Sequence, residues 1–348
     1  MQILRAGHSG RQEDSWAPLN AGGEDLTMTT VAGSDSEAGE LPDGNAAGAS
    51  AVLTTGASGL VGSRLVPELL RRFGSVHTLS RNPRKSTGSV VRHPWDGTDP
   101  GLDPLRGTTA VVHLSGEPIF GGLPTRSRRD RIRSSRVDST RKIVERIGQL
   151  EAEDRPATLV CASAVGYYGD RGEVELDEDA APGEGFLAEV CREWEAAAAG
   201  AEAHGVRVVR IRIGVVLSRA GGALPLIRLP FSLGLGGRLG DGRQFFPWIH
   251  LDDLVAVFLW ALEESSVSGS VNAVAPEAVR NETLTRELGR VLGRPTLLPV
   301  PGFALRAVMG ELAGELLGSR RVVPKRLEAA GFRFRFPTLA AALEAELG

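Results

Sequence analysis

Hydrophobic positions fall into two alternating patterns from residue 51 onward. Short runs of apolar residues predict buried strands, and longer stretches with apolar residues three or four positions apart predict amphipathic helices. The short runs lie near residues 52, 76, 111, 159 and 208. Buried strands that alternate with helices are typical of a parallel sheet covered by helices on both faces. The pattern therefore predicts an α/β fold built on a doubly wound parallel sheet.

The first and last residues of two predicted helices can be read from the sequence. Residues 62–73 carry Leu65, Leu69 and Leu70 on one face, and Gly74 ends this helix before the next strand. Residues 126–146 form a basic run of the kind that nucleic-acid-binding proteins also contain. Because its apolar residues have helical spacing, we interpret the run as a solvated helix with one buried stripe. The stripe consists of Ile132, Val137, Ile143, Val144 and Ile147.

Residues 1–50 differ from the rest of the chain. They are rich in Gly, Ala, Ser, Asp and Glu and lack apolar periodicity, so they bury too little surface to offset the entropy lost on ordering. We predict that they form a disordered arm. The arm has no apolar run of signal-peptide type, and nowhere does the chain contain about 18 consecutive uncharged apolar residues, which disfavours secretion and membrane spanning.

Composition narrows the class of function. The 348 residues are 42% hydrophobic and 24% charged, as in a globular protein of one or two lobes. A net charge of −3 gives no electrostatic reason to expect nucleic acid or an anionic membrane as a partner. Cys161 and Cys191 lack metal-ligand spacing and lie in apolar stretches, so we expect two buried thiols. We therefore expect a cytoplasmic protein with a small-molecule substrate and no metal site.

A glycine-rich turn joins the first predicted strand to the first predicted helix. In T-T-G-A-S-G-L-V-G, residues 54–62, Gly56 and Gly59 allow a tight turn whose amides can approach a pyrophosphate, and Gly62 lets the helix pack closely. The alternative is a glycine-rich loop without a ligand. Because a strand precedes the turn and a helix follows it, we favour a dinucleotide with its phosphates at the helix N-terminus. The expected binding residues are Gly56, Ser58, Gly59, Leu60, Val61 and Gly62.

The segment after the second predicted strand indicates which dinucleotide binds. NAD-selective folds place a carboxylate about 20 residues after the glycine motif, where it binds the ribose hydroxyls. Here residues 80–85 read S-R-N-P-R-K, without an acid. The hydroxyl of Ser80 and the guanidinium of Arg81 suit a 2′-phosphate. A basic, solvated turn is the alternative, and we predict NADP (NADPH) as the cofactor.

The third predicted strand leads into the loop L-S-G-E at residues 114–117. Ligands of open parallel sheets bind at the carboxyl ends of the strands, so we expect this loop to lie near the cofactor. Arg136, on the basic helix, is expected to reach the cofactor as well. His113 lies inside the strand, and we interpret it as a packed core residue. The loop residues expected at the cofactor are Leu114, Ser115, Gly116 and Glu117.

Several motifs resemble one known family. The spacing T-G-x-x-G-x-x-G at residues 55–62 is similar to the pattern of extended short-chain dehydrogenases/reductases and epimerases. Further motifs match in chain order over residues 51–348, and together they resemble the atypical short-chain dehydrogenase/reductase group called the epimerase family protein. These motifs are L-S-G-E-P-I, A-V-G-Y-Y-G-D, L-G-L-G-G, F-F-P-W-I-H and V-V-P-K-R-L-E-A-A-G-F.

The resemblance implies a domain organisation. A Rossmann-type NADP-binding domain would occupy residues 51–265, and a small mixed or helical substrate lobe would occupy residues 266–348. Residues 214–250 would contribute to the substrate lobe. The group's small C-terminal domain would span about 297–348, beginning with a helix over 300–317.

The resemblance also implies roles for single residues. The family's catalytic serine corresponds to Ser163, and Val216 lies in a segment that runs beneath the nicotinamide. His250 and Asp252 match a family segment, for which we favour a structural role. Asp252 and Asp253 can cap the helix that follows.

One family feature is missing. Family enzymes use a tyrosine as proton donor and a lysine four residues later, on the same helix face. Neither Tyr167 nor Tyr168 has such a lysine, and Leu187 and Cys191 occupy the positions of the pair on the matching helix. The hydroxyls expected near the reacting carbon are those of Ser163, Tyr167 and Tyr168. We choose Tyr167 as the proton donor. The alternative is that both tyrosines only pack the loop and line the wall of the pocket.

These features predict an NADP-dependent oxidoreductase that acts on an unidentified small molecule. A phenol without a neighbouring lysine is a poor base at neutral pH but can donate a proton, which favours carbonyl reduction. A nucleotide-sugar epimerase or dehydratase is the first alternative. A non-catalytic NADP-binding regulatory or scaffold protein is the second. We expect a monomer or a homodimer.

Overall fold

The computed structural model describes residues 50–81, 83, 85–119, 125–310 and 313–348. The disordered arm predicted for residues 1–50 lies outside these ranges, apart from Ser50. Within the described ranges, no helix is long and apolar enough to cross a membrane.

Seven parallel strands form the central sheet, in the order β11-β7-β5-β4-β1-β2-β3. The predicted parallel sheet is thereby confirmed, and five of its strands coincide with the short apolar runs. Neither edge strand was predicted from the sequence, because V-V-R-H-P and G-S-V-N-A contain few consecutive apolar residues. The strands are β1 (Ala51–Thr55), β2 (Ser75–Ser80), β3 (Val90–Pro94), β4 (Thr108–His113), β5 (Thr158–Ala164), β7 (Arg207–Ile213) and β11 (Gly269–Ala273).

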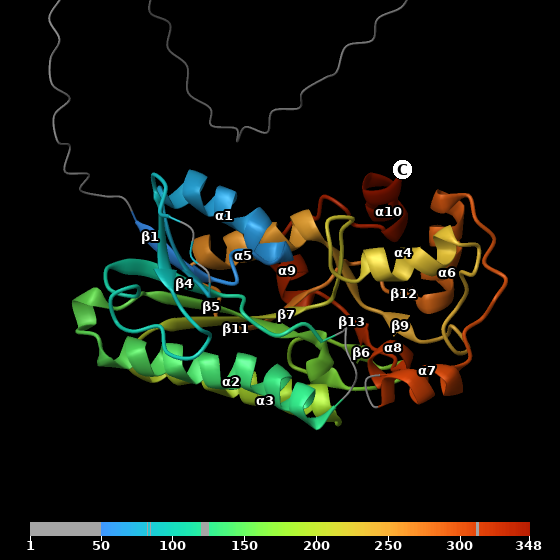
Figure 1. Cartoon of the computed structure of the whole chain (residues 1–348), viewed down its shortest axis with the longest axis horizontal. Coiled ribbons are helices and arrows are strands. Elements are labelled where there is room, and N and C mark those ends of the chain that lie inside the picture. The colour runs from blue at the N-terminus through green and yellow to red at the C-terminus, as the bar shows by residue number, and fades with distance from the viewer. Residues whose placement is uncertain (1–49, 82, 84, 120–124, 311–312) are drawn as a thin grey trace, which may run out of the picture. The chain divides into compact units, whose positions relative to one another are not determined.

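Helices cover both faces of this sheet (Figure 1). α1 (Leu60–Phe73) and α5 (Leu251–Glu263) lie on one face, and α2 (Arg126–Gln149) and α3 (Phe186–Ala199) lie on the other. The apolar stripe predicted for the basic run is buried along α2, whereas Arg131, Arg133 and Arg141 of the same helix are exposed. The basic run is therefore an amphipathic helix with a solvated outer face, as predicted.

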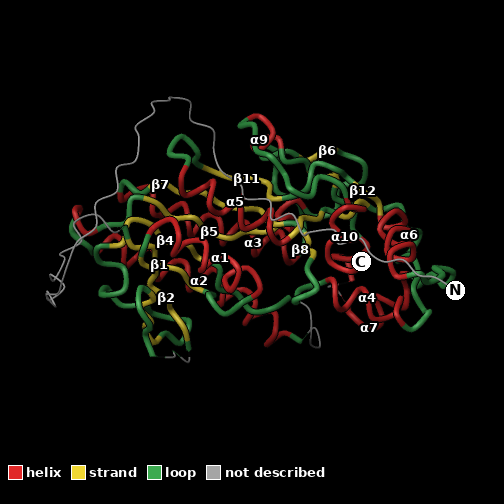
Figure 2. The backbone as a smooth tube through the Cα atoms, turned by 90° about the horizontal axis from the view of Figure 1, so that it is seen from above, coloured by secondary structure: helices red, strands yellow, loops and turns green. Residues whose placement is uncertain are grey.

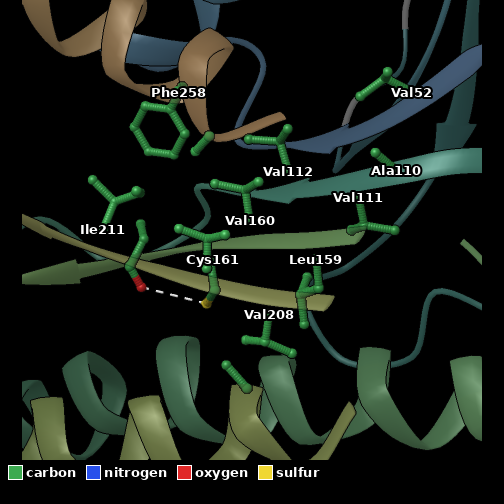
Figure 3. Close-up of a cluster of buried hydrophobic side chains, with 14 of the residues drawn as sticks. Val52, Ala110, Val111, Val112, Leu159, Val160, Cys161, Val208, Ile211 and Phe258 are labelled. Atoms are coloured by element: carbon green, nitrogen blue, oxygen red, sulfur yellow. Dashed lines mark hydrogen bonds between the residues drawn. The ribbon is translucent and has the colours of Figure 1, made fainter. Parts of the chain in front are cut away.

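The main hydrophobic core lies between the sheet and these helices. Val112 and Val160, from adjacent strands, point toward Phe258 of α5, and all three side chains are fully buried (Figure 3). Leu159 and Cys161 of β5 point toward the opposite face, where α2 and α3 lie (Figure 3). Because successive strand side chains point to opposite faces, a strand between two helix layers must be apolar throughout. This requirement explains the uninterrupted apolar run of β5.

The remaining elements are short, and many of them follow the carboxyl ends of the strands. Figure 2 shows α4, α6 and α10 gathered together, away from β1 and β2. Within the described ranges, the 3₁₀ helices with defined bounds are η1 (Ala152–Asp154), η2 (Val165–Tyr168) and η3 (Gly200–His204). The other elements are β6 (Glu175–Leu176), β8 (Val215–Leu217), α4 (Leu224–Ser232), β9 (Phe245–Phe246), β10 (Trp248–His250), β12 (Val279–Arg280), α6 (Asn281–Leu292), α7 (Gly302–Met309), α8 (Ala313–Leu317), β13 (Arg321–Val322), α9 (Lys325–Ala329) and α10 (Leu339–Leu347).

A second apolar cluster holds α4, α6 and α10 together. It combines side chains from the 214–250 segment with side chains from the last third of the chain. β13 pairs in parallel with β6, so the C-terminal part is also bonded to the segment that precedes α3. The buried members of the cluster include Leu217, Leu224, Phe231, Trp248, Leu284, Leu288, Leu339 and Leu343.

The prediction of one continuous helix over residues 300–317 was wrong. The structure has two shorter helices there, α7 and α8. α7 ends at Met309, and its C-cap, Gly310, has a φ of 56°, which is incompatible with continuing a right-handed helix. Sequence periodicity alone did not reveal this break.

The predicted cap of α5 was also wrong. The N-cap is His250, whose Nδ1 accepts a hydrogen bond from the backbone N–H of Asp252 at 3.1 Å. Asp253 instead accepts from the backbone N–H groups of Arg335 and Phe336, at 2.7 and 3.0 Å. Its carboxylate therefore fastens the C-terminal segment to α5, which is a structural role.

Candidate cofactor and substrate site

The β1–α1 turn is shaped by glycines that have no room for a side chain. A Cβ at Gly62 would lie 2.2 Å from the carbonyl oxygen of Gly56 and 2.7 Å from the Cα of Ala57. Gly56 has a φ of 68°, which favours glycine, and a Cβ there would lie 3.0 Å from the carbonyl carbon of Leu114. The glycines therefore bring the turn, the first helical turn and the β4 loop into backbone contact.

The N-terminus of α1 is suited to an anion. Its N-cap, Gly59, has no side chain that could accept from the first amides, and the first turn contains no acidic residue. The unpaired N–H groups and the helix dipole at such an end attract negative charge. The turn therefore fits the pyrophosphate of a dinucleotide, because the N-cap carries no side chain and no acidic residue of the first turn would repel a phosphate.

A buried histidine fixes the β4 loop beside this turn. The Oγ1 atom of Thr55 accepts from the N–H groups of Leu114 and Ser115 at 3.0 and 3.1 Å, and lies 2.8 Å from Nδ1 of His113. Thr55 must therefore donate its own hydrogen to Nδ1, which leaves the hydrogen on Nε2, 3.3 Å from the hydroxyl of Ser139. Burial lowers the pKa of His113 to about 3, so the ring is neutral. The predicted core role of His113 is confirmed.

Arg136 lies under the β4 loop. A Cβ on Gly116 would lie 3.0 Å from the guanidinium carbon of Arg136, and the N–H of Glu117 donates to the hydroxyl of Ser135 at 2.9 Å. The Arg136 guanidinium also lies 5.4 Å from the ring centre of Trp194. Burial lowers the pKa of Arg136. The structure thus brings Arg136 and the predicted loop residues together at the carboxyl ends of the strands, where the glycine turn also lies.

Ser80 and Arg81 lie at the carboxyl end of β2, the strand that pairs with β1, at the same end of the sheet as the glycine turn. β1 and β2 are parallel, with Thr55 opposite Leu79, so Ser80, the last residue of β2, and Arg81, which follows it, lie beside the glycine turn. Ser80 is half-buried and Arg81 is exposed. This position suits a clamp on the adenosine ribose, as predicted for a 2′-phosphate.

The helix that carries the family's tyrosine and lysine has apolar residues at those positions. Leu187 and Cys191 are both buried on α3, and burial raises the pKa of the Cys191 thiol to about 12. Neither side chain can exchange a proton near neutral pH. Cys161 is buried as well, so the expectation of two buried thiols is confirmed.

A buried ion pair, which was not predicted from the sequence, lies one helical turn beyond Cys191 on α3. Arg212 of β7 binds Glu195 of α3 through two hydrogen bonds of 2.8 and 2.9 Å, and both side chains are at least nine-tenths buried. The hydroxyl of Ser163 is also buried and donates to Glu195 at 2.7 Å. In this arrangement Ser163 is bonded to a carboxylate, and its catalytic role stays a prediction. An arginine inside the apolar run of β7 was the available signal for the pair.

The two tyrosines have different surroundings. The hydroxyl of Tyr168 is buried, accepts from Arg212 at 2.8 Å and lies 2.7 Å from Oδ1 of Asn272. Burial raises the pKa of Tyr168 to about 12. Tyr167 is half-buried, and its ring centre lies 3.6 Å from the guanidinium carbon of Arg212. Among the described residues, no side chain or backbone group is hydrogen-bonded to the Tyr167 hydroxyl, so that hydroxyl is the more available of the two.

A cavity of about 420 Å³ lies at the start of α3, next to Leu187. It holds Glu315 of α8, whose Oε2 accepts from Arg320 at 2.7 Å, while Nε of Arg320 donates to the carbonyl of Gly169 at 2.8 Å. Burial raises the pKa of Glu315. Neither residue was predicted from the sequence, because no motif links Glu315 or Arg320 to α3. The cavity is lined by Arg129, Gly169, Asp170, Glu184, Gly185, Phe186, Leu187, Gly310, Gly314, Glu315 and Arg320.

Known relatives share this architecture over most of the chain. The "Epimerase family protein SDR39U1 homolog, chloroplastic" of Arabidopsis thaliana is 41% identical over 299 residues, which cover 84% of this chain and 86% of that protein. The crystal structure of human epimerase family protein SDR39U1 (isoform2) with NADPH is 33% identical, with a TM-score of 0.76, and covers 85% of this chain and 99% of that one.

A second solved structure bears a different name. The nucleoside-diphosphate sugar epimerase from Corynebacterium glutamicum is 38% identical with a TM-score of 0.70, covering 86% of this chain and 58% of that chain. Residues 300–346 match a domain of unknown function, DUF1731. Residues 52–274 match the NAD dependent epimerase/dehydratase family. The predicted resemblance is confirmed, and the chain belongs to the NAD dependent epimerase/dehydratase family.

Proposed function

We propose that the protein is an NADP-dependent oxidoreductase that acts on a small molecule bound in the cavity beside α3. The proposal rests on the glycine turn, where Gly62 lies against the backbone of Gly56 and leaves the N-terminus of α1 open to phosphates. Bound NADPH supplies a hydride. The NADPH in the human relative supports the same cofactor here.

Within this proposal, the chain's own residues bind, orient and donate a proton. The β1–α1 turn would hold the pyrophosphate, Ser80 and Arg81 would hold the 2′-phosphate, and Val216 would contact the nicotinamide. Tyr167, which lies two residues before Gly169 of the cavity lining, donates a proton to the oxygen of the substrate. It belongs to η2, which packs on α3 at the position of the missing tyrosine, since a Cβ on Gly166 would lie 3.3 Å from the Cβ of Leu187. Glu315 is a second candidate donor, because its carboxyl lines the cavity and burial raises its pKa.

Cofactor choice tests the first part of the proposal. In isothermal titration calorimetry, NADPH is expected to bind more tightly than NADH, and Arg81→Ala should weaken NADPH binding by about 1–3 kcal/mol, because it removes a charge-assisted contact. NADH binding should hardly change. Arg141→Ala, which removes an exposed arginine of α2, is the matched control and should leave both affinities unaltered. Equal affinities of the parent for the two cofactors would rule out the proposed 2′-phosphate clamp.

Proton donation is tested by single-turnover oxidation of NADPH with a panel of small carbonyl compounds. Tyr167→Phe should slow the reaction by about a hundredfold, at the low end for general acids, without lowering stability. Tyr168→Phe is the comparison at the neighbouring position, and it should mainly reduce stability, because Arg212 and Asn272 each lose a buried partner. Glu315→Gln belongs in the same series. A Tyr167→Phe rate within about threefold of the parent would mean that Tyr167 is not the acid. The rate of Glu315→Gln would then decide whether Glu315 has this role or whether neither residue does.

A nucleotide-sugar epimerase is the second candidate function, and the name of the Corynebacterium glutamicum structure favours it. Against it, Leu187 and Cys191 replace the pair that shuttles protons in such enzymes. Turnover of UDP-sugars or dTDP-sugars would identify this activity. A chain that binds NADPH but turns over neither sugars nor carbonyl compounds would instead fit a non-catalytic, NADP-binding regulatory role.

A further inference from the structure

Two segments of the chain carry positive charge without any negative charge. Between residues 219 and 240, and again between 288 and 310, every charged residue is an arginine. Acidic residues outnumber basic ones in the chain as a whole, 43 against 40. The net charge of −3 for the whole chain therefore conceals a local excess of positive charge. The arginines are Arg219, Arg228, Arg238, Arg290, Arg294 and Arg306.

The same two segments expose most of the large apolar side chains that face solvent. Among the described residues, eight large hydrophobic side chains are largely exposed, and all except Val174 lie in these segments. A soluble surface usually scatters such residues singly, whereas a contiguous group marks an interaction site. The seven are Leu226, Leu229, Leu233, Leu235, Leu297, Leu298 and Phe303, with exposed fractions from 52% to 81%.

The two segments run side by side. Leu239 pairs with Val300 in a parallel bridge, in which the N–H of Val300 donates to the carbonyl of Arg238 at 2.8 Å. A Cβ on Gly237 would lie 1.8 Å from the carbonyl oxygen of Leu298, so the backbones are in close contact. Figure 1 places α4 and the segment between α6 and α7 in the same part of the molecule. We call the exposed leucines and arginines of 226–240 and 294–298 the leucine–arginine surface.

The charge on this surface is not neutralised within the protein. In the part of the chain that the structure describes, Arg228, Arg238 and Arg294 are exposed and make no ion pair. The arginines of α2 differ, because Arg133 and Arg141 are paired with acidic residues. The leucine–arginine surface therefore keeps its positive charge available to a partner.

We propose that the leucine–arginine surface binds the head-group region of an anionic phospholipid membrane. Leucines at the surface would enter the boundary between head groups and acyl chains, and the arginines would attract the lipid phosphates. Such binding is peripheral and requires no membrane-spanning helix. A protein partner is less favoured, because protein interfaces are enriched in aromatic residues and carry many hydrogen-bonding groups, whereas this surface is mostly leucine.

Vesicle co-sedimentation of the full chain tests the proposal. The parent should sediment with vesicles of phosphatidylcholine and phosphatidylglycerol, much less with phosphatidylcholine alone, and less as salt is added. The double variant Arg228→Gln/Arg238→Gln should lower the partition coefficient by about 25-fold, roughly fivefold for each arginine. Leu233→Ser/Leu235→Ser should lower it by at least about tenfold, because apolar area no longer enters the interface.

Two single variants serve as controls. Val174→Ser removes an exposed apolar residue outside the surface, and Arg141→Gln removes an exposed arginine of α2. Both should sediment like the parent, and circular dichroism should show that every variant is folded. A parent that stays in the supernatant with the anionic vesicles would overturn the proposal, as would double variants that bind like the parent. A dimer that Leu233→Ser/Leu235→Ser dissociates, without any vesicle binding, would assign the surface to a second copy of the chain.

Discussion

Gly62→Ala is expected to lower NADPH affinity by more than about a hundredfold and to destabilise the fold by about 3 kcal/mol or more. The added Cβ would lie 2.2 Å from the carbonyl oxygen of Gly56 and 2.7 Å from the Cα of Ala57. Both neighbours are backbone atoms, so no side-chain rotation can relieve the clash. The turn would have to open, and the amides at the start of α1 would no longer point at the phosphates.

Two measurements check this expectation, urea unfolding for stability and fluorescence titration for NADPH affinity. Gly200→Ala is the matched control, because the new Cβ would meet only the Cγ1 of Val144 at 3.4 Å, an ordinary contact remote from the turn. That control should keep the parent's affinity and unfold within about 1 kcal/mol of the parent. Parental stability and affinity in Gly62→Ala would show that the close contact is not required.

Arg212→Met is expected to destabilise the protein by about 3–5 kcal/mol. The substitution leaves the carboxylate of Glu195 buried without its partner, and it removes the guanidinium that contacts Tyr167 and Tyr168. A buried charge that loses its partner costs far more than an exposed one, because water cannot replace the lost interaction. The measurement is the free energy of unfolding in urea at neutral pH.

A comparison pair and a double variant sharpen this test. Arg141→Met breaks an ion pair with Asp138 in which both side chains are more than half exposed, and it should cost less than about 1 kcal/mol. Arg212→Met/Glu195→Gln should recover part of the loss, because it removes the orphaned charge. Equal unfolding free energies of Arg212→Met and Arg141→Met would mean that the buried pair contributes no more than a surface pair.

The glycine turn and the place of Ser80 and Arg81 at the end of a strand could be predicted from the sequence. Each lies at the carboxyl end of a strand, and the cofactor contacts expected of them, which stay a prediction, depend on residues only a few positions away. The five inner strands could be predicted for a related reason, since burial between two helix layers favours several apolar residues close together in each strand. The edge strands β3 and β11 lack that requirement, so their short and mixed sequences carried too little signal.

The pairs that complete the site and the proposed membrane surface emerged only in the folded chain. Glu195 meets Arg212, Glu315 lies in a cavity with Leu187, and Leu239 runs beside Val300. A single charge or leucine has the same local pattern whether it faces solvent or a partner far along the chain. Periodicity reports which face of an element is apolar, but not which distant element will cover it. That choice depends on the order of the strands and on how the C-terminal segment returns to them, and only the tertiary structure contains it.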